Sequence, residues 1–281
     1  MTVPSIPLHD GTSIPQLGFG VFQVPPEQAA ETVGTALEVG YRHIDTAQMY
    51  GNEDGVGRAI KDSGIARDEL YVTTKLNNGF HRPDDARRSL DESLARLGLD
   101  RVDLFLIHWP LPTLYDGDFV STWRTLVELA GEGLTASVGV SNFQPAHLDR
   151  IVEETGVVPV VNQVEVHPFF GNADVRAANA RHGVVTQAWS PIAQGKVADD
   201  PTLVGIAEAH DATAAQVTLA WHLHRGDVVF PKSMRRERMQ QNFDAVDIAL
   251  ADEEIAAIDA LDRGEPGRLG PNPDTFDHVP D

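Results

Sequence analysis

Four side chains in the first half of the chain could together protonate a carbonyl oxygen. They are an aspartate, a tyrosine, a lysine and a histidine, and each stands at or just beyond the carboxyl end of a segment with the composition of a β-strand: Asp45, Tyr50, Lys75 and His108. A free tyrosine has a pKa of ~10, and a neighbouring lysine ammonium favours the phenolate. We therefore expect Lys75 to lower the pKa of Tyr50, and Asp45 to hold the lysine charged.

The histidine completes this chemistry, because an imidazole beside a phenol can donate a hydrogen bond to a carbonyl oxygen and orient it. The set would then place a proton donor against an oxygen that gains negative charge. Carbonyl reduction also requires a hydride, which no side chain delivers, so a nicotinamide cofactor is implied. Each residue alone also has a purely structural interpretation, and the prediction depends on all four lying together.

The elements that would position these residues alternate between strand and helix. A tight hairpin is expected around Asp10-Gly11, and extra helices follow the last strand, over 235–243 and 252–261. Eight strands are predicted, over 17–22, 41–46, 70–76, 102–109, 135–140, 157–164, 184–189 and 228–230. Strict alternation predicts an α/β fold, an eight-stranded parallel (β/α)8 TIM barrel formed by a single domain over 1–281. A doubly wound sheet is the alternative, but no G-x-G-x-x-G turn follows an early strand.

In such a barrel the carboxyl ends of the strands form one rim, where the chemistry gathers. Trp189, with Ser190 beside it, could stack on a nicotinamide ring, and three polar residues could bind its carboxamide: Ser141, Asn142 and Gln163. Asn142 could equally be a helix cap, and Gln163 a packed polar strand end. Near the last strand Lys232, Ser233 and Arg238 precede or begin a helix, as a phosphate site does.

Composition bounds the remaining choices. The 281 residues carry a formal charge of −20, from 42 acidic and 22 basic residues, which makes nucleic acid or an anionic membrane a poor partner. A local cluster of basic residues on so acidic a chain favours an anion site over a solvated turn. The sequence has no cysteine, which excludes disulfides and thiolate metal sites, and we predict no metal. It shows neither a signal peptide nor a membrane span, so we expect a cytoplasmic protein, and a monomer.

Six motifs in order along the chain resemble the aldo-keto reductase family: G-Y-R-H-I-D-T-A-Q-M-Y-G-N-E from Gly40, V-T-T-K-L from Val72, L-F-L-I-H-W-P from Leu104, G-V-S-N-F from Gly139, V-N-Q-V-E-V-H-P from Val161 and F-P-K-S-M-R-R-E-R from Phe230. The resemblance covers the whole chain and is strongest to bacterial 2,5-diketo-D-gluconate reductases. It implies a tetrad of Asp45, Tyr50, Lys75 and His108 with Tyr50 as proton donor, NADPH as cofactor, and a small-molecule carbonyl substrate such as a keto-sugar. It places cofactor contacts on the residues named above and on Asn242.

Two positions depart from the family pattern. Asn77 stands where relatives often carry a tryptophan that walls the substrate pocket, alongside Phe22 and Trp109, with Tyr50 and His108 at its base. Gln241 stands where many carry a glutamate that bonds the adenine, so we expect weaker adenine contacts without loss of binding. The tail, 264–281, covers the substrate pocket in relatives and varies freely among them, so the sequence does not identify the substrate.

Two other functions use the same residues. A barrel lyase would form a Schiff base on Lys75, which requires a neutral amine, whereas Asp45 favours the charged form. A cofactor-binding sensor would keep the site and turn over little, but the chain shows no additional interaction domain.

Overall fold

A closed parallel barrel forms the centre of the molecule. The computed structural model describes residues 3–280, and its main sheet has eight strands in the order β10-β9-β8-β7-β6-β5-β4-β3, all adjacent pairs being parallel. Leu17 forms a parallel bridge with Val229, and the Gly18 amide donates to the Val229 carbonyl at 2.7 Å, which closes the sheet on itself. The strands are β3 (Phe19–Gly20), β4 (His43–Asp45), β5 (Tyr71–Leu76), β6 (Val102–Ile107), β7 (Thr135–Ser141), β8 (Val161–Glu165), β9 (Val185–Trp189) and β10 (Val228–Val229). The predicted barrel is confirmed.

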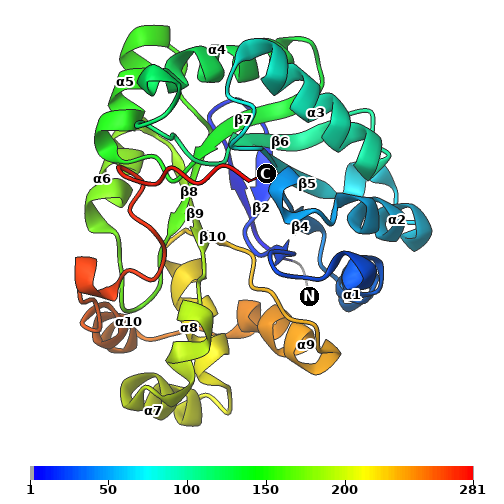
Figure 1. The fold of residues 1–281 in the computed structure, drawn as a ribbon. Coiled ribbons are helices and arrows are strands. Elements are labelled where there is room, and N and C mark those ends of the chain that lie inside the picture. The colour runs from blue at the N-terminus through cyan, green and yellow to red at the C-terminus, as the bar shows by residue number, and fades with distance from the viewer. Residues whose placement is uncertain (1–2, 281) are drawn as a thin grey trace.

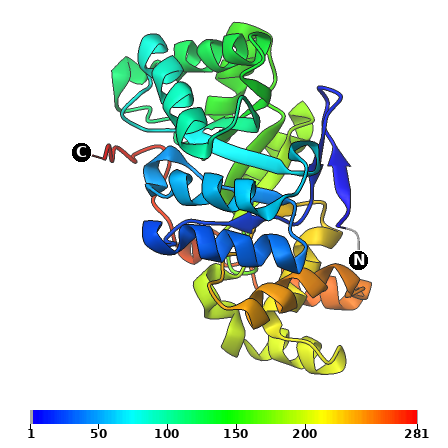
Figure 2. The same ribbon diagram turned by 90° about the vertical axis from the view of Figure 1, so that its right-hand side faces the viewer.

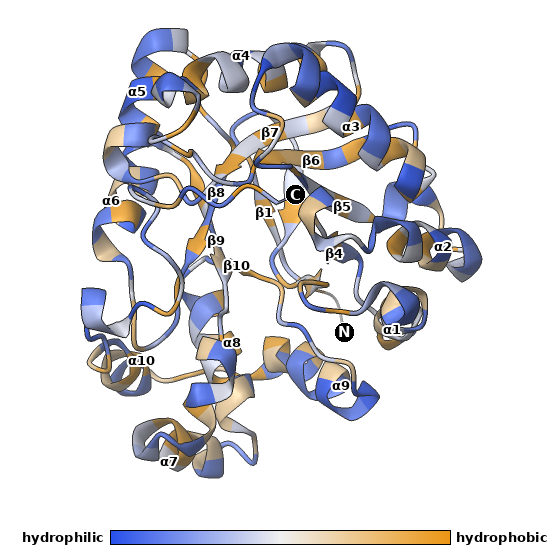
Figure 3. Ribbon diagram, viewed as in Figure 1, coloured by the Kyte–Doolittle hydropathy of each residue, from blue (hydrophilic) through white to orange (hydrophobic). Residues whose placement is uncertain are grey.

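Helices follow every strand and surround the barrel (Figure 1). Much of their outward surface is polar, while the strands they cover mix apolar and polar stretches (Figure 3). Among residues 3–280, every helix is too short or too polar to serve as a membrane span. The helices are α1 (Pro26–Val39), α2 (Glu53–Ser63), α3 (Pro83–Leu97), α4 (Phe119–Gly131), α5 (Pro145–Thr155), α6 (Ala173–His182), α7 (Pro201–Ala209), α8 (Ala214–His224), α9 (Arg236–Asp244) and α10 (Asp252–Asp259).

The predicted N-terminal hairpin forms and closes one end of the barrel. Its strands are β1 (Ser5–Pro7) and β2 (Ser13–Pro15), and the turn between them places Gly11 at φ 90°, which a glycine adopts without strain. Leu8 and Ile14 pack in one buried cluster with interior residues of the barrel, including Leu104 and Val161. Figure 2 shows this hairpin and the C-terminal segment at opposite ends of the molecule.

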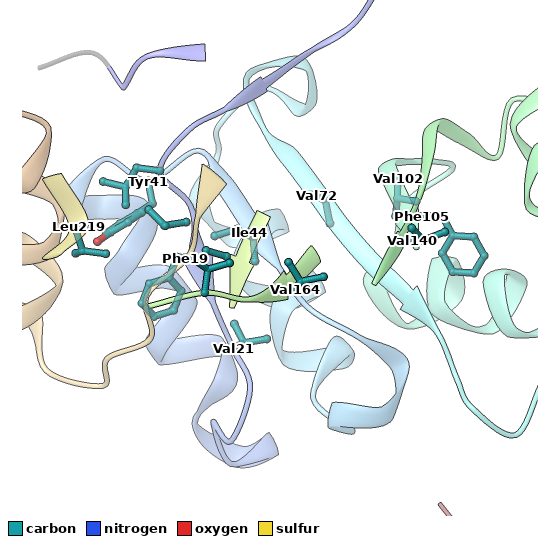
Figure 4. Packing of buried hydrophobic residues seen from close by; sticks show 14 of the residues in the cluster. Phe19, Val21, Tyr41, Ile44, Val72, Val102, Phe105, Val140, Val164 and Leu219 are labelled. Carbon is teal, nitrogen blue, oxygen red and sulfur yellow. The ribbon is translucent and has the colours of Figure 1, made fainter. Parts of the chain in front are cut away.

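Alternation along the strands separates the barrel interior from the layer under the helices. On β6, Leu104 and Leu106 belong to the interior cluster with the hairpin, whereas Phe105 and Ile107 belong to the large cluster under the helices. Figure 4 shows part of that large cluster, with Phe19, Ile44 and Val72 on strands β3, β4 and β5. Because both faces of β6 are buried there, residues 104–107 form a continuous apolar run, whereas β8 and β9 carry buried polar residues such as Asn162 and Gln187.

Several strands are shorter than predicted. The segment 157–164 begins its ladder only at Val161, because Pro159 has no N–H to donate to a neighbouring strand. The segment 17–22 contributes only Phe19–Gly20, and Phe22 lies beyond it in a turn. In the segment 41–46 only His43–Asp45 is paired, because the Tyr41 amide donates to the Ala36 carbonyl at the end of α1. The Tyr41 hydroxyl donates to the Met239 carbonyl on α9.

Candidate active site

Period-two alternation brings the predicted catalytic residues to the interior side of one rim. In the sheet register, Asp45 pairs with Thr73, two residues before Lys75, and Lys75 pairs with Leu106, two residues before His108. Side chains two residues apart on a strand share a face, so Asp45, Lys75 and His108 point into the same end of the barrel. Tyr50 ends a short 3₁₀ helix, Gln48–Tyr50, in the loop after β4.

The first three predicted residues form a hydrogen-bonded chain. Lys75 Nζ lies 2.6 Å from Asp45 Oδ1 and 3.3 Å from the Tyr50 hydroxyl, and it also donates to the Thr46 carbonyl at 2.8 Å. The lysine is fully buried and Asp45 is nearly so. Ammonium and carboxylate are thus held in fixed geometry away from water, where their mutual electrostatic interaction is strong, and the half-buried phenol lies at the edge of this pair.

The pKa of Tyr50 corrects one prediction. Burial of the phenol raises its pKa, the Lys75 ammonium lowers it and the Asp45 carboxylate raises it again, so the net shift is upward. Lysine therefore opposes the effect of burial without reversing it, and Tyr50 is a protonated phenol at neutral pH. The pKa of Lys75 is lowered by burial but raised more by Asp45 and Tyr50, so the amine remains charged.

His108 lies beside the phenol as a neutral ring. Its ring centroid is 5.7 Å from that of Tyr50, in an edge-on arrangement. Burial, with a smaller contribution from the Lys75 charge, lowers the pKa of His108 well below its usual range. Nδ1 is buried and has no partner among the described residues, which favours the tautomer that carries its proton on Nε2.

Gln163 contacts the tetrad directly. Its Nε2 donates to Asp45 Oδ2 at 2.7 Å and to Gln187 Oε1 at 3.2 Å. Both carboxylate oxygens of Asp45 are therefore bonded, one to Lys75 and one to Gln163. Sequence reasoning did not identify Gln187 or the Thr46 carbonyl, although the pairing of Gln187 with Gln163 across β8 and β9 follows from the strand register.

The residues predicted to contact a nicotinamide form a second connected group. Trp189 Nε1 donates to Asn142 Oδ1 at 2.9 Å, and Asn142 Nδ2 donates to the His108 carbonyl at 2.9 Å. Ser141 Oγ donates to the Gln163 carbonyl at 2.8 Å. Asn142 and Ser190 adopt left-handed backbone, with φ of 63° and 49°. Such strained residues persist where the surrounding structure holds them, often at functional sites.

A cavity of about 820 Å³ lies where the basic cluster was predicted to bind phosphate. Lys232, Ser233, Arg238 and Asn242 line it, as does Gln241. Arg236 does not, because it pairs with Glu38 at 2.6 Å on the surface. Residues that the sequence did not single out form the opposite wall, from the segment 192–198 and helices α7 and α8. In the described part of the chain, no group of three or more acidic or histidine side chains could hold a metal ion.

Known proteins share extensive sequence similarity with this chain. The pattern of the Aldo/keto reductase family matches residues 16–263. This chain belongs to that family. An aldo-keto reductase of Mycolicibacterium smegmatis is 46% identical over 97% of this chain and 98% of its own. Methylglyoxal reductase DkgA of Escherichia coli K12 is 46% identical over 96% and 97%.

Solved structures of the family have the same fold. An aldo/keto reductase of Brucella melitensis superposes with a TM-score of 0.90 at 47% identity, covering 93% of this chain and 99% of that one. A substituted form of Gox0644 in complex with NADPH superposes with a TM-score of 0.93 at 42% identity, covering 98% and 99%.

The predicted substrate-contacting residues of this aldo-keto reductase lie around the tetrad. Phe22 is 59% exposed and its ring centroid is 5.1 Å from that of Tyr50. Trp109 is buried beneath Phe276 of the C-terminal segment, with ring centroids 4.0 Å apart. Asn77 is half-buried and accepts from the Gly79 amide, so its carbonyl oxygen stabilises a turn. The predicted irregular tail does fold over this rim, where Asn78 Nδ2 donates to the His278 carbonyl at 2.9 Å.

Proposed function

We propose that this aldo-keto reductase reduces aldehydes and ketones to alcohols with NADPH, and that Tyr50 supplies the proton. The chain Tyr50–Lys75–Asp45 carries the proposal. It presents a protonated phenol whose deprotonated form would face a permanent positive charge at 3.3 Å. Protonation of a developing alkoxide requires an acid whose conjugate base is stabilised where it forms.

Each protein group has a separate part in the reaction. NADPH, when bound, supplies the hydride that forms the new C–H bond at the carbonyl carbon. Tyr50 gives its proton to the carbonyl oxygen, and the resulting phenolate is stabilised by Lys75. Neutral His108 donates a hydrogen bond to the same oxygen and orients the carbonyl. Lys75 does not form a Schiff base, because its pKa is raised and its amine is charged.

The cofactor residues fit a dinucleotide phosphate. Trp189, held by Asn142, offers an indole for the nicotinamide ring, with Ser141, Gln163 and Ser190 nearby. At the cavity, Lys232, Ser233 and Arg238 would bind the ribose phosphate, with Asn242 at the adenine. Ser233 Oγ accepts from the Arg235 amide at 3.1 Å and donates to the Arg235 carbonyl at 3.4 Å, a long contact that the hydroxyl would exchange for a phosphate oxygen.

Small dicarbonyl compounds are the first substrates to test. Methylglyoxal is suggested by the DkgA relatives, and the keto-sugar 2,5-diketo-D-gluconate by the resemblance of the sequence. Phe22, Trp109 and Asn77 would contact the substrate next to Tyr50 and His108.

Replacing the phenol tests the assignment. In Tyr50→Phe we expect NADPH oxidation with methylglyoxal to fall by about 10²–10⁴-fold, the usual contribution of a general acid. Binding of NADPH, followed by tryptophan fluorescence, should be retained. Tyr71→Phe is the matched control, because its buried hydroxyl has no partner among the described residues and packs with the hairpin at the other end of β5. Wild-type turnover in Tyr50→Phe would refute the assignment.

A further inference from the structure

The carboxylate of Glu165, at the end of β8, is not used by the proposed chemistry. Its side chain is 1% exposed, and its two oxygens are bonded to different backbone amides of the C-terminal segment. The Leu269 amide donates to Oε1 at 2.6 Å, and the Gly270 amide donates to Oε2 at 2.9 Å. His167 Nε2 lies 3.0 Å from Oε1 and is also buried. A buried carboxylate thus fixes a segment that is about a hundred residues away in sequence.

Gly270, which Glu165 binds, also contacts Trp189, the residue proposed to stack on the nicotinamide. Glu165 and Trp189 are register partners on β8 and β9, so their side chains lie next to each other on the interior face. A Cβ on Gly270 would lie 2.4 Å from the Trp189 indole and 3.1 Å from Glu165 Oε2. The backbone of the segment is therefore in contact with both side chains, and only glycine leaves room for that approach.

The C-terminal segment has two parts with different anchorage. The part 262–270, which we call the tail root, is densely bonded to the loop after β8: the Arg263 amide donates to the Phe169 carbonyl, and the guanidinium groups of Arg263 and Arg268 lie over Phe169 and Phe170 at 4.4 and 4.5 Å. Beyond it, residues 271–280 cross the rim through few contacts, chiefly those of Phe276 and His278. Glu165 bonds the last two residues of the tail root, where the crossing begins.

We propose that Glu165 is a positioning residue that couples the cover of the substrate site to the wall of the cofactor site. Its carboxylate holds the Leu269 and Gly270 amides, and Gly270 in turn fixes the plane of the Trp189 indole. This inference rests on the proposed function, since it assigns Trp189 to the nicotinamide and Phe276 to the substrate side. The buried Glu165 side chain then determines both the position from which residues 271–280 cross the rim and the position of the Trp189 indole.

Two variants test the two parts of the proposal separately: Glu165→Gln tests the hold on the tail root, and Gly270→Ala tests the contact with the Trp189 indole. Glu165→Gln replaces one acceptor oxygen with an amide group that cannot accept, so one tail amide loses its partner. Trypsin cleavage after Arg268 reports the loss, because the bond that is cut carries the Leu269 amide and Arg268 is only 10% exposed in its side chain. We expect cleavage at least about tenfold faster than wild type, the scale of one lost hydrogen bond to a charge. Glu253→Gln, exposed on α10, is the matched control.

Gly270→Ala tests the contact with the indole without replacing any residue of the tetrad. The added methyl must displace Trp189 or the tail root, so we expect the NADPH dissociation constant and the KM for methylglyoxal to rise about tenfold. Changes in kcat should stay within about threefold, because Tyr50 and Lys75 are untouched. A merely structural residue would lower Tm without this KM-against-kcat split.

Either of two results would overturn the proposal. Cleavage of Glu165→Gln no faster than that of Glu253→Gln, or an unchanged dissociation constant and KM in Gly270→Ala, overturns the proposal. If Glu165→Gln does not fold, Gly270→Ala decides alone. The cleavage assay needs neither cofactor nor substrate, so it remains interpretable if the Tyr50→Phe experiment refutes the proposed function.

Discussion

The ion pair between Lys75 and Asp45 gives the sharpest quantitative prediction. Both groups are almost completely removed from water, and their charged atoms are 2.6 Å apart. Removing one partner of such a pair leaves an uncompensated buried charge, which typically costs about 3–5 kcal/mol of unfolding free energy. We expect Asp45→Asn and Lys75→Met each to lose that amount, a large fraction of the roughly 5–15 kcal/mol that stabilises a folded protein.

The two losses should not add. In the double variant neither charge remains, so the desolvation cost disappears with the attraction, and the loss should be at least about 2 kcal/mol smaller than the sum of the single losses. The pair Arg236–Glu38 provides the control, because its charged atoms are also 2.6 Å apart but its side chains are 57% and 68% exposed. Glu38→Gln should cost less than about 1 kcal/mol.

Urea unfolding of the wild type and the four variants, followed by far-UV circular dichroism, measures these differences. Activity offers a second readout: Asp45→Asn removes the main cause that raises the pKa of Lys75 while burial still lowers it, so the support of the lysine for the Tyr50 phenolate weakens and turnover falls. Additive losses in the double variant, or single losses as small as that of Glu38→Gln, would refute the view that this pair is a coupled buried unit.

Two further predictions concern the cofactor and the pH dependence. Arg238→Ala should weaken the binding of NADPH about ten- to a hundredfold in a fluorescence titration and leave the binding of NADH nearly unchanged. Arg236→Ala, whose side chain pairs with Glu38 on the surface, is the control. Equal losses of affinity for both cofactors would mean that Arg238 does not contact the ribose phosphate. His81 lies buried in the loop between β5 and α3, where its carbonyl accepts from Thr122, and burial lowers its pKa to about 4. The folded protein therefore binds fewer protons than the unfolded chain below pH ~6.5 and loses stability as the pH falls toward 4. Between pH 7 and pH 4, the wild type should lose about 3 kcal/mol more than His81→Gln in urea unfolding, and parallel losses would contradict this assignment.

The barrel and the tetrad could be predicted because each depends on a local pattern. Alternation of strand and helix indicates the barrel, and the polar residues at the ends of the predicted strands indicate the rim, so the sequence alone places Asp45, Lys75 and His108 there. Strand ends were less accurate where a single residue decides the pairing, as Pro159 does before β8.

What could not be predicted depends on residues distant in sequence. The net shift of the Tyr50 pKa was predicted with the wrong sign, because spacing reveals the lysine but not the desolvation of the phenol in the folded site. The bond from Gln163 to Asp45 links β8 to β4 across the barrel interior, and the bonds of Glu165 reach the tail root. Such contacts follow from closure of the sheet and from the path of the last segment, which no local pattern encodes.

The opposite placement of the N-terminal hairpin and the C-terminal segment has a practical consequence for attaching this enzyme to a surface or a reporter. A linker joined after residue 280 would start at the mouth of the site, next to residues that cover Trp109, and would crowd arriving carbonyl compounds. A linker joined ahead of β1 would leave from the sealed end of the barrel, so an immobilised catalyst tethered there would face its substrate solution with the mouth outward.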